Sequence, residues 1–323
     1  MNLHENNKLF RQAVRYAAQE MKIKPIYVEK DYWVCFVLDL IYMQEYRNEI
    51  LFKGGTSISK CFDLLNRFSE DIDLVVLKKK RETDREHLKK RNAISNLVSK
   101  ELPEIHVEGF TKKKGPNRRS AHQYKKEFSG KFGQVKDTIY IDASHMESYE
   151  PQMKSSVKSY VGIKMEESQP GMIEEYNMHP IEVNVLDPTR TICDKIMNLV
   201  RMSHTDDPIT NIKRRIRHTY DLHILLRDER FSGFFESDNF DRMMSKVIEH
   251  DRKSYDNVNR YLDKHPKDAL IFIDTENVWN QLSKTYSGEF KDLVYGELPR
   301  EQKITETLKR ISDRLSRMTW PPV

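Results

Sequence analysis

The chain has 323 residues, enough for one large core or two modest domains. Hydrophobic residues make up 38% and charged residues 33%, which is typical of a soluble protein, and no apolar run approaches the length of a membrane span. Cys35, Cys61 and Cys193 are too few and too far apart for a disulfide framework or a cysteine metal site. We therefore expect a cytoplasmic protein with no membrane contact.

The first part of the chain predicts helices separated from strands by clear breaks in hydrophobic periodicity. Apolar residues recur at three- and four-residue spacing on either side of Pro25, which we expect to separate two helices. The predicted elements are helices at 5–22 and 28–46, a strand–loop–helix–strand unit at 50–77, a polar helix at about 81–100 and a strand at 104–110.

The second part changes character near residue 187. Residues 137–142 and 181–185 alternate polar and apolar side chains and predict strands, with an irregular stretch that can hold a hairpin between them. After Asp187-Pro188 the pattern is helical, first at 189–202 and then at 211–227. We expect one domain at 1–186 and a mainly helical domain at 187–323.

A glycine pair at the end of the first predicted strand is a candidate phosphate-binding loop. Gly54 and Gly55 allow the close approach or positive φ that a loop around a triphosphate needs. Thr56 and Ser57 then open a helix whose amino end favours anions, and their hydroxyls are further phosphate ligands. With Lys53, these residues form the predicted nucleotide-binding segment.

Two aspartates follow on the second strand of the same unit. Asp71 and Asp73 lie on one face of that strand because side chains alternate with a period of two. Paired carboxylates are suited to Mg²⁺, which would assist attack on a triphosphate. Asp142, on a later strand, is a candidate third metal ligand, and Glu182 is its rival. For each of the two, an exposed strand carboxylate is the preferred interpretation.

Either motif alone is weak, because a glycine pair usually makes a tight turn and an Asp-x-Asp is often a solvated strand end. In this order, on a strand–turn–helix–strand frame, they resemble the active site of polymerase-β-like nucleotidyltransferases. That likeness implies an α+β fold in which a small mixed sheet is flanked by helices, with a helical carboxy-terminal domain.

A basic stretch between residues 112 and 136 is a candidate RNA-binding segment. Basic residues interleaved with aromatic ones can follow a phosphate backbone and stack unpaired bases. The alternative is a solvated loop or helix face. The candidate contacts are Lys112, Lys113, Lys114, Arg118 and Arg119.

Four ordered motifs resemble the AbiEii family of nucleotidyltransferase toxins, which includes the MenT toxins. The motifs are Glu29-Lys30-Asp31-Tyr32, the segment from Phe52 to Leu74 with both motifs above, Asp187 to Lys195, and Arg217-His218-Thr219-Tyr220-Asp221-Leu222. One departure is Asp194, where the family pattern leads us to expect glutamate beside the lysine.

The resemblance implies roles that the residues alone do not. Lys195 would steady the triphosphate, and Asp221 would act as a base or as the partner of that lysine; without the resemblance, each is an ordinary helical surface charge. It also implies that Gly55, Thr56 and Ser57 bind phosphates and that Asp71 and Asp73 hold magnesium. Since some relatives carry Ser or Thr first in the Asp-x-Asp pair, Asp73 is the safer catalytic assignment.

The implied function is Mg²⁺-dependent transfer of a nucleotide from a nucleoside triphosphate to RNA, with the tRNA 3′ end as acceptor, by a toxin whose antitoxin is encoded nearby. Two alternatives remain open at this point. In the first alternative, the enzyme transfers the nucleotide to a protein or a small molecule. In the second, the chain is a non-catalytic nucleic-acid-binding protein on the same scaffold.

Overall fold

The computed structural model describes residues 1–113, 115, 117–130, 135–145, 149, 151–254 and 259–320. The chain forms two compact units. The first comprises Met1–Asp63 and Arg67–Leu186, and the second comprises Leu64–Asn66 and Asp187–Val323.

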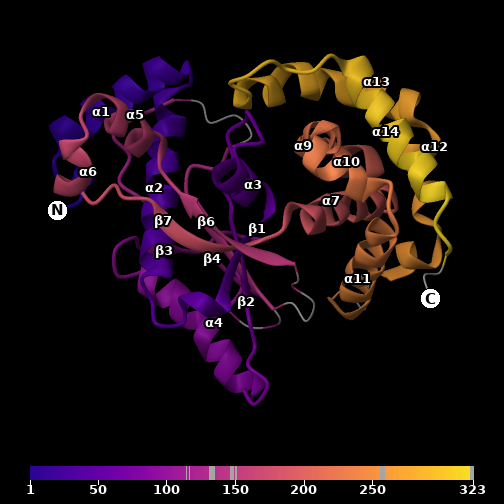
Figure 1. The fold of residues 1–323 in the computed structure, drawn as a ribbon, viewed down its shortest axis with the longest axis horizontal. Helices are drawn as coiled ribbons and strands as arrows, with labels where there is room; N and C mark the ends of the chain where they lie inside the picture. Colours follow the sequence, from indigo (N-terminus) through magenta and orange to yellow (C-terminus); the bar gives the residue numbers. More distant parts are fainter. Residues whose placement is uncertain are drawn as a thin grey trace. The chain divides into compact units, whose positions relative to one another are not determined.

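The first unit is built on a mixed sheet with the strand order β3-β4-β5-β2-β1-β7-β6. β1 lies inside the sheet, antiparallel to β2 and parallel to β7, and β2 is parallel to β5 (Figure 1). The strands are β1 (Ile50–Lys53), β2 (Ile72–Val76), β3 (Glu104–Ile105), β4 (Asn117–His122), β5 (Ile139–Ser144), β6 (Gln152–Val157) and β7 (Ile181–Leu186). The α+β class and the mixed sheet flanked by helices are confirmed.

The helices of the first unit pack on this sheet and on one another. They are α1 (Asn7–Met21), α2 (Pro25–Tyr42), α3 (Gly54–Phe62), α4 (Asp84–Val98), α5 (Tyr160–Ser168) and α6 (Gly171–Glu175). α2 contacts both β7 and β5, and α1 and α5 pack against α2 (Figure 1). Nearly all of α2 is buried, which explains its continuous apolar run.

Several predicted boundaries were wrong for identifiable reasons. Pro25 does not separate the first two helices but begins α2, because a first-turn proline needs no N–H donor. The strand predicted at 104–110 is only Glu104–Ile105, since residues 108–110 form a turn. The stretch expected to be irregular before β7 contains β6, α5 and α6.

The second unit is helical. It contains α7 (Pro188–Ser203), α8 (Pro208–Lys213), α9 (Ile216–Arg227), α10 (Glu229–Phe235), α11 (Asp238–Ser254), α12 (Leu270–Ile273), α13 (Thr275–Thr285) and α14 (Glu301–Ser316). Asp187 caps α7 by accepting from Thr189 N at 2.9 Å, and Pro188 occupies the first helical position. In place of the single helix predicted at 211–227, the structure has two helices, α8 and α9. Within the described residues, no helix has the length and apolarity to cross a bilayer.

Candidate functional site

Gly54 sits where the strand β1 turns into α3, directly against the carboxylate of Asp73. Its φ is +82°, in the left-handed region that favours glycine. A Cβ built on Gly54 would lie 2.6 Å from Asp73 Oδ2. Lys53 precedes the glycine and lies opposite Asp73 in the register of the antiparallel strands β1 and β2. The glycine motif and the second aspartate therefore form one site.

The hydroxyls that follow the glycines are used within the protein. Thr56 and Ser57 are both buried. Thr56 Oγ1 shares a hydrogen bond with Ser69 Oγ at 2.9 Å, and Ser57 Oγ donates to Gly54 O at 2.9 Å. In this structure these hydroxyls hold the loop in shape. The phosphate ligands that the loop offers are backbone N–H groups at the start of α3, whose Lys53 N-cap makes no side-chain capping bond.

Asp71 and Asp73 lie at the start of β2, between the glycine loop on one side and β5 on the other. Asp142 of β5 is the direct register partner of Asp73, so both carboxylates stand on the same face of the sheet. Arg119 Nε donates to Asp142 Oδ2 at 2.8 Å. Oδ1 of Asp142 is buried and has no hydrogen-bond partner among the described residues.

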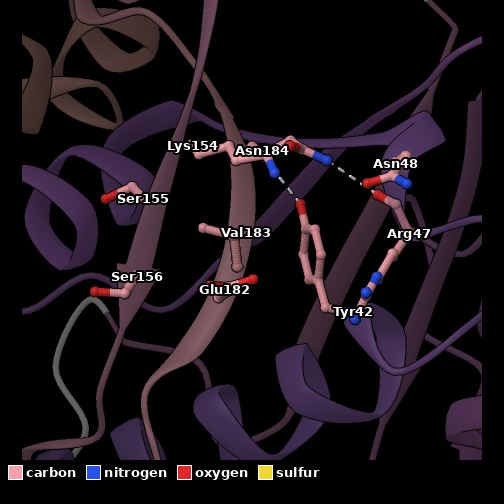
Figure 2. Close-up of a pocket in the computed structure, with 9 residues that line it drawn as sticks. All are labelled: Tyr42, Arg47, Asn48, Lys154, Ser155, Ser156, Glu182, Val183 and Asn184. Carbon is pink, nitrogen blue, oxygen red and sulfur yellow. Dashed lines mark hydrogen bonds between the residues drawn. The ribbon is translucent and has the colours of Figure 1, made fainter.

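Glu182, the rival third ligand, lies elsewhere. In the register of the sheet, Phe52 is opposite Val185, so Glu182 lies opposite the residue that precedes β1. Asp73 lies opposite Lys53, at the other end of β1. Glu182 lines a cavity of about 380 Å³ at the edge formed by β6 and β7 (Figure 2). Its other lining residues are Tyr42, Arg47, Asn48, Lys154, Ser155, Ser156, Val183 and Asn184.

The carboxylates fit a magnesium ion as a pair. Among the described residues, no group of three or more His, Cys, Asp or Glu side chains is arranged to hold a metal. Asp142 therefore does not complete a three-carboxylate cluster with Asp71 and Asp73. Magnesium usually takes one or two protein carboxylates and completes its shell with substrate phosphates and water. The carboxylate oxygens of Asp71 and Asp73, next to the glycine loop, suit that arrangement.

The tripeptide Glu29-Lys30-Asp31 of α2 is charged and buried, and it supports the candidate site. Lys30 Nζ is ion-paired with Glu70, the residue before Asp71, and also donates to Lys136 O. Asp31 Oδ1 accepts from Lys60 Nζ of α3 at 2.6 Å, and its Oδ2 accepts from Tyr160 N at 2.6 Å. One helix thus anchors both the helix after the glycine loop and the entry to the aspartate strand. Hydropathy does not predict this burial of charges.

Glu29, the first residue of the same tripeptide, is also buried in α2. Its carboxylate accepts from Glu127 N at 2.6 Å and from Phe128 N at 3.2 Å. Burial raises the pKa of Glu29 from 4.5 to about 6, against the opposing effect of these two backbone donors. It therefore ties α2 to residues 127–128 within the basic stretch.

In the second unit, Lys195 of α7 and Asp221 of α9 form a buried ion pair. Lys195 Nζ donates to Asp221 Oδ2 at 2.6 Å and lies 3.4 Å from His218 Nδ1. Burial, and then the charge of Lys195, hold the pKa of His218 well below its usual range. A neutral imidazole beside the ammonium can accept a hydrogen bond from it. The structure thus joins the two residues that the family motifs suggested.

Asp194, the departure from the family pattern, bonds within its own helix. Its Oδ1 accepts from Arg190 Nε at 3.1 Å, four residues earlier on α7. Arg190 is fully buried. The shorter acid therefore serves as a partner for a buried arginine next to Lys195.

The basic stretch is only partly available to a ligand. Arg118 is buried, and its Nη2 donates to both carboxylate oxygens of Glu104 at 2.8 and 2.7 Å, so it is not an exposed RNA contact as expected. Arg119 is engaged with Asp142. Lys112 and Lys113 are exposed, while Lys114 lies outside the described residues.

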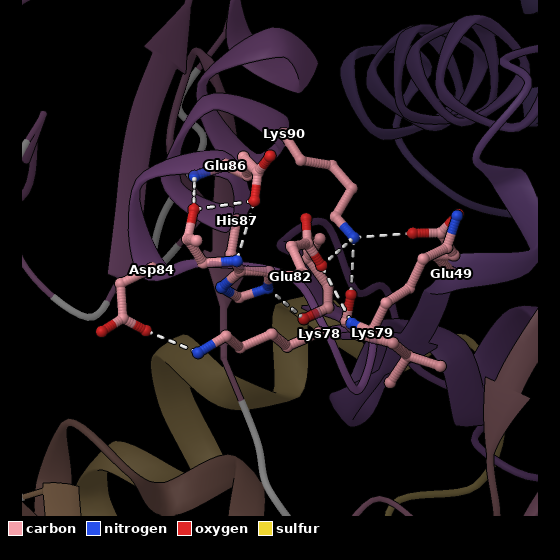
Figure 3. Close-up of polar contacts among 11 residues, drawn as sticks. Glu49, Lys78, Lys79, Glu82, Asp84, Glu86, His87 and Lys90 are labelled. Carbon is pink, nitrogen blue, oxygen red and sulfur yellow. Dashed lines mark hydrogen bonds and ion pairs between the residues drawn. The ribbon is translucent and has the colours of Figure 1, made fainter.

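Lys78 and Lys79, which follow β2, form a second group of basic residues, and both are ion-paired with acids (Figure 3). Lys78 Nζ pairs with Asp84 Oδ1 and Lys79 Nζ with Glu49 Oε1, each at 2.7 Å. Lys90 of α4 also pairs with Glu49, at 2.6 Å. This block is an ion-pair network around the amino end of α4.

Comparison with protein families identifies one family. The model described as "Nucleotidyl transferase AbiEii toxin, Type IV TA system" matches residues 37–313. Among solved structures, the chain is similar to the MenT4 nucleotidyltransferase toxin of Mycobacterium tuberculosis H37Rv, with 14% identity and a TM-score of 0.43, covering 92% of this chain and 98% of that one. A search of curated proteins gives no match. The family match contains every candidate catalytic residue.

Proposed function

Because the chain belongs to the AbiEii family of nucleotidyl transferase toxins of type IV toxin–antitoxin systems, we propose that it transfers a nucleoside monophosphate from a triphosphate to RNA, with the tRNA 3′ end as acceptor. The family implies a nucleoside triphosphate substrate and an antitoxin partner. The observation that supports the proposal is the closeness of Gly54 to Asp73 Oδ2, because it brings the proposed phosphate loop next to a proposed metal ligand.

The reaction is an in-line displacement at the α-phosphorus. An acceptor hydroxyl forms the new O–P bond, the bond from the α-phosphorus to the bridging oxygen breaks, and pyrophosphate leaves. The hydroxyl proton is released to solvent. The N–H groups at the start of α3 would bind the phosphate chain, and the absence of a side chain at Gly54 lets the chain approach closely.

Asp71 and Asp73 are the proposed magnesium ligands. When bound, the ion would neutralise charge on the triphosphate and on the leaving pyrophosphate. Asp73 is held on a central strand by pairing with Lys53 and Asp142 on either side, which fixes its position without the ligand.

Lys195 and Asp221 are proposed to act as a pair on the phosphates. The 2.6 Å ion pair favours Asp221 as the partner that orients Lys195, rather than as a separate base. Both residues belong to the second unit. Most of the rate gain would come from positioning and charge neutralisation.

We propose a reducing cytoplasm as the cellular setting. All three cysteines are free thiols, and Cys35 and Cys193 are buried. A reducing cytoplasm, where tRNA and nucleoside triphosphates meet, is consistent with that chemistry.

The test is transfer of label from each nucleoside triphosphate to cellular RNA in magnesium by the wild type and Asp73→Asn. We expect label in a tRNA-sized band with the wild type and a loss of about a thousandfold or more in the variant, with an unchanged melting temperature. Asp313→Asn, at an exposed acid of α14 in the second unit, is the control and should retain activity. Equal transfer by the Asp73 variant would refute the assignment.

A further inference from the structure

An aromatic and basic cluster stands beside the candidate aspartates, on the side away from the glycine loop. Phe110 and Tyr140 pack edge to face, with ring centroids 4.3 Å apart. Lys136 Nζ lies 3.9 Å from the centroid of the Tyr140 ring and 5.2 Å from that of Phe110. The Arg119 guanidinium lies 5.9 Å from the Phe110 ring. We call these four residues the aromatic platform.

The platform shares a sheet face with the aspartates. Tyr140 is two residues from Asp142, so it projects from the same face of β5 as the register partner of Asp73. The ammonium of Lys136 lies 3.6 Å from Asp71 Oδ1 and so connects the rings to the carboxylate pair. Its side chain is 43% exposed and that of Asp71 is 28% exposed, so both side chains are partly accessible to a ligand.

The sheet order separates two substrate positions. β2, which carries the aspartates, lies between β1 with its glycine loop and β5 with the platform. A triphosphate held by the loop approaches the aspartates from the β1 side. In-line displacement requires the attacking hydroxyl opposite the leaving pyrophosphate, hence on the side of the platform.

We infer that the aromatic platform binds the unpaired 3′-terminal nucleotide of an RNA acceptor, an inference that rests on the proposed function. The base would stack on the Phe110–Tyr140 pair, and Lys136 would bind the adjoining phosphate. Aromatic rings stack any unpaired base, and cations beside them favour the charged backbone. A folded protein surface or a small metabolite would not need stacked aromatic rings next to cations for binding.

The experiment compares steady-state transfer to a short RNA with an unpaired 3′ end and to the same RNA as a blunt duplex. The proteins are wild type, Tyr140→Leu, Phe110→Leu and Tyr140→Phe. Tyr140→Leu and Phe110→Leu should raise the KM for the unpaired acceptor about tenfold or more, with the KM for the triphosphate unchanged. Tyr140→Phe keeps the ring and should behave as wild type.

Controls distinguish the platform from general damage. Tyr16→Leu changes an exposed tyrosine of α1 in the same unit and should leave both KM values unchanged. Melting temperatures identify a variant that is merely unfolded, and in that case Lys136→Gln, at an exposed position, supplies the same comparison of KM values.

Each outcome decides the inference. A preference for the unpaired acceptor in the wild type that the leucine variants lose would support it. Unchanged acceptor KM with active enzyme would overturn it and leave the proposed function intact. A raised KM for the triphosphate alone would assign the platform to the donor base instead. A wild type that labels no RNA would overturn the proposed function and this inference with it.

Discussion

Gly54 and Asp73 come from different motifs, yet each determines the space available to the other. The glycine lacks the one atom that would collide with the carboxylate, and it has the backbone conformation that other residues avoid. The spacing in the sequence suggested both motifs. It did not show that they are in contact, because that contact depends on the register between β1 and β2.

The first prediction concerns Gly54→Ala. The positive φ should cost about 1–2 kcal/mol of stability. Displacement of Asp73 by the new methyl should lower transfer by about a hundredfold. Urea unfolding and transfer assays measure the two effects. Gly171→Ala, where a Cβ meets nothing within 4 Å, is the matched control and should be neutral or slightly stabilising. Full activity of Gly54→Ala would mean that the close contact is not needed.

A second prediction concerns the pH dependence of stability. The pKa of Glu29 is raised by burial from 4.5 to about 6, so the folded protein holds this proton more tightly than the unfolded chain does. The contribution is present below about pH 4.5 and is lost as the pH rises through about 6. Unfolding free energies measured from pH 4.5 to 7 should therefore fall more steeply in wild type than in Glu29→Gln. Parallel curves would contradict this.

At the level of elements, α2 is the support on which both halves of the first-unit site depend. Lys30 is connected to Glu70 next to the aspartates, and Asp31 is connected to Lys60 of α3. Removing one member of a buried ion pair leaves an uncompensated charge, which costs more than replacing both.

The third prediction is a double-mutant cycle on that support. Lys30→Met alone should destabilise the protein by about 3–5 kcal/mol. Lys30→Met combined with Glu70→Gln should recover most of the loss, since Gln can still accept from Lys136 N as Glu70 does at 3.0 Å. Urea unfolding of the four proteins gives the coupling energy. Additive single effects would show that the pair is not coupled.

Much of this architecture was predictable from local patterns. The strand at 181–185 is confirmed as β7, and the strand–loop–helix–strand unit is confirmed as β1, α3 and β2. The burial of Glu29, Lys30 and Asp31 was not predictable. Their partners lie from 29 to 129 residues away, and hydropathy assigns such charges to the surface.

The basic stretch shows the same limit of sequence patterns. Arg118 and Arg119 looked like surface cations, but they are strand residues whose side chains face opposite sides of the sheet. Arg118 forms an ion pair with Glu104, and Arg119 forms one with Asp142. Lys136, which no motif singled out within the stretch, lies beside Asp71.

At the scale of the whole molecule, the candidate catalytic residues are divided between the two units. Asp71 and Asp73 belong to the sheet unit, and Lys195 and Asp221 to the helical unit. Sequence pattern alone gave the first pair a chemical role. The second pair needed the family resemblance, because a lysine and an aspartate on helices have no diagnostic spacing.

The fourth prediction tests whether the pair in the helical unit is more than structural. Lys195→Met combined with Asp221→Leu removes both buried charges and should fold with nearly wild-type stability. Transfer should nevertheless fall by about a hundredfold or more, because the lysine proposed to bind the phosphates is removed. Melting temperature and transfer rate are measured together. A stable double variant with full activity would confine the pair to a structural role.

The central claim is that the chain transfers a nucleotide and not a terminal phosphate. The most direct test incubates the wild-type protein, magnesium and RNA with a nucleoside triphosphate labelled at either the α- or the γ-phosphorus. We predict α-label in the RNA and γ-label only in released pyrophosphate. Label in the RNA from the γ-position, or none from the α-position with any of the four triphosphates, would contradict it.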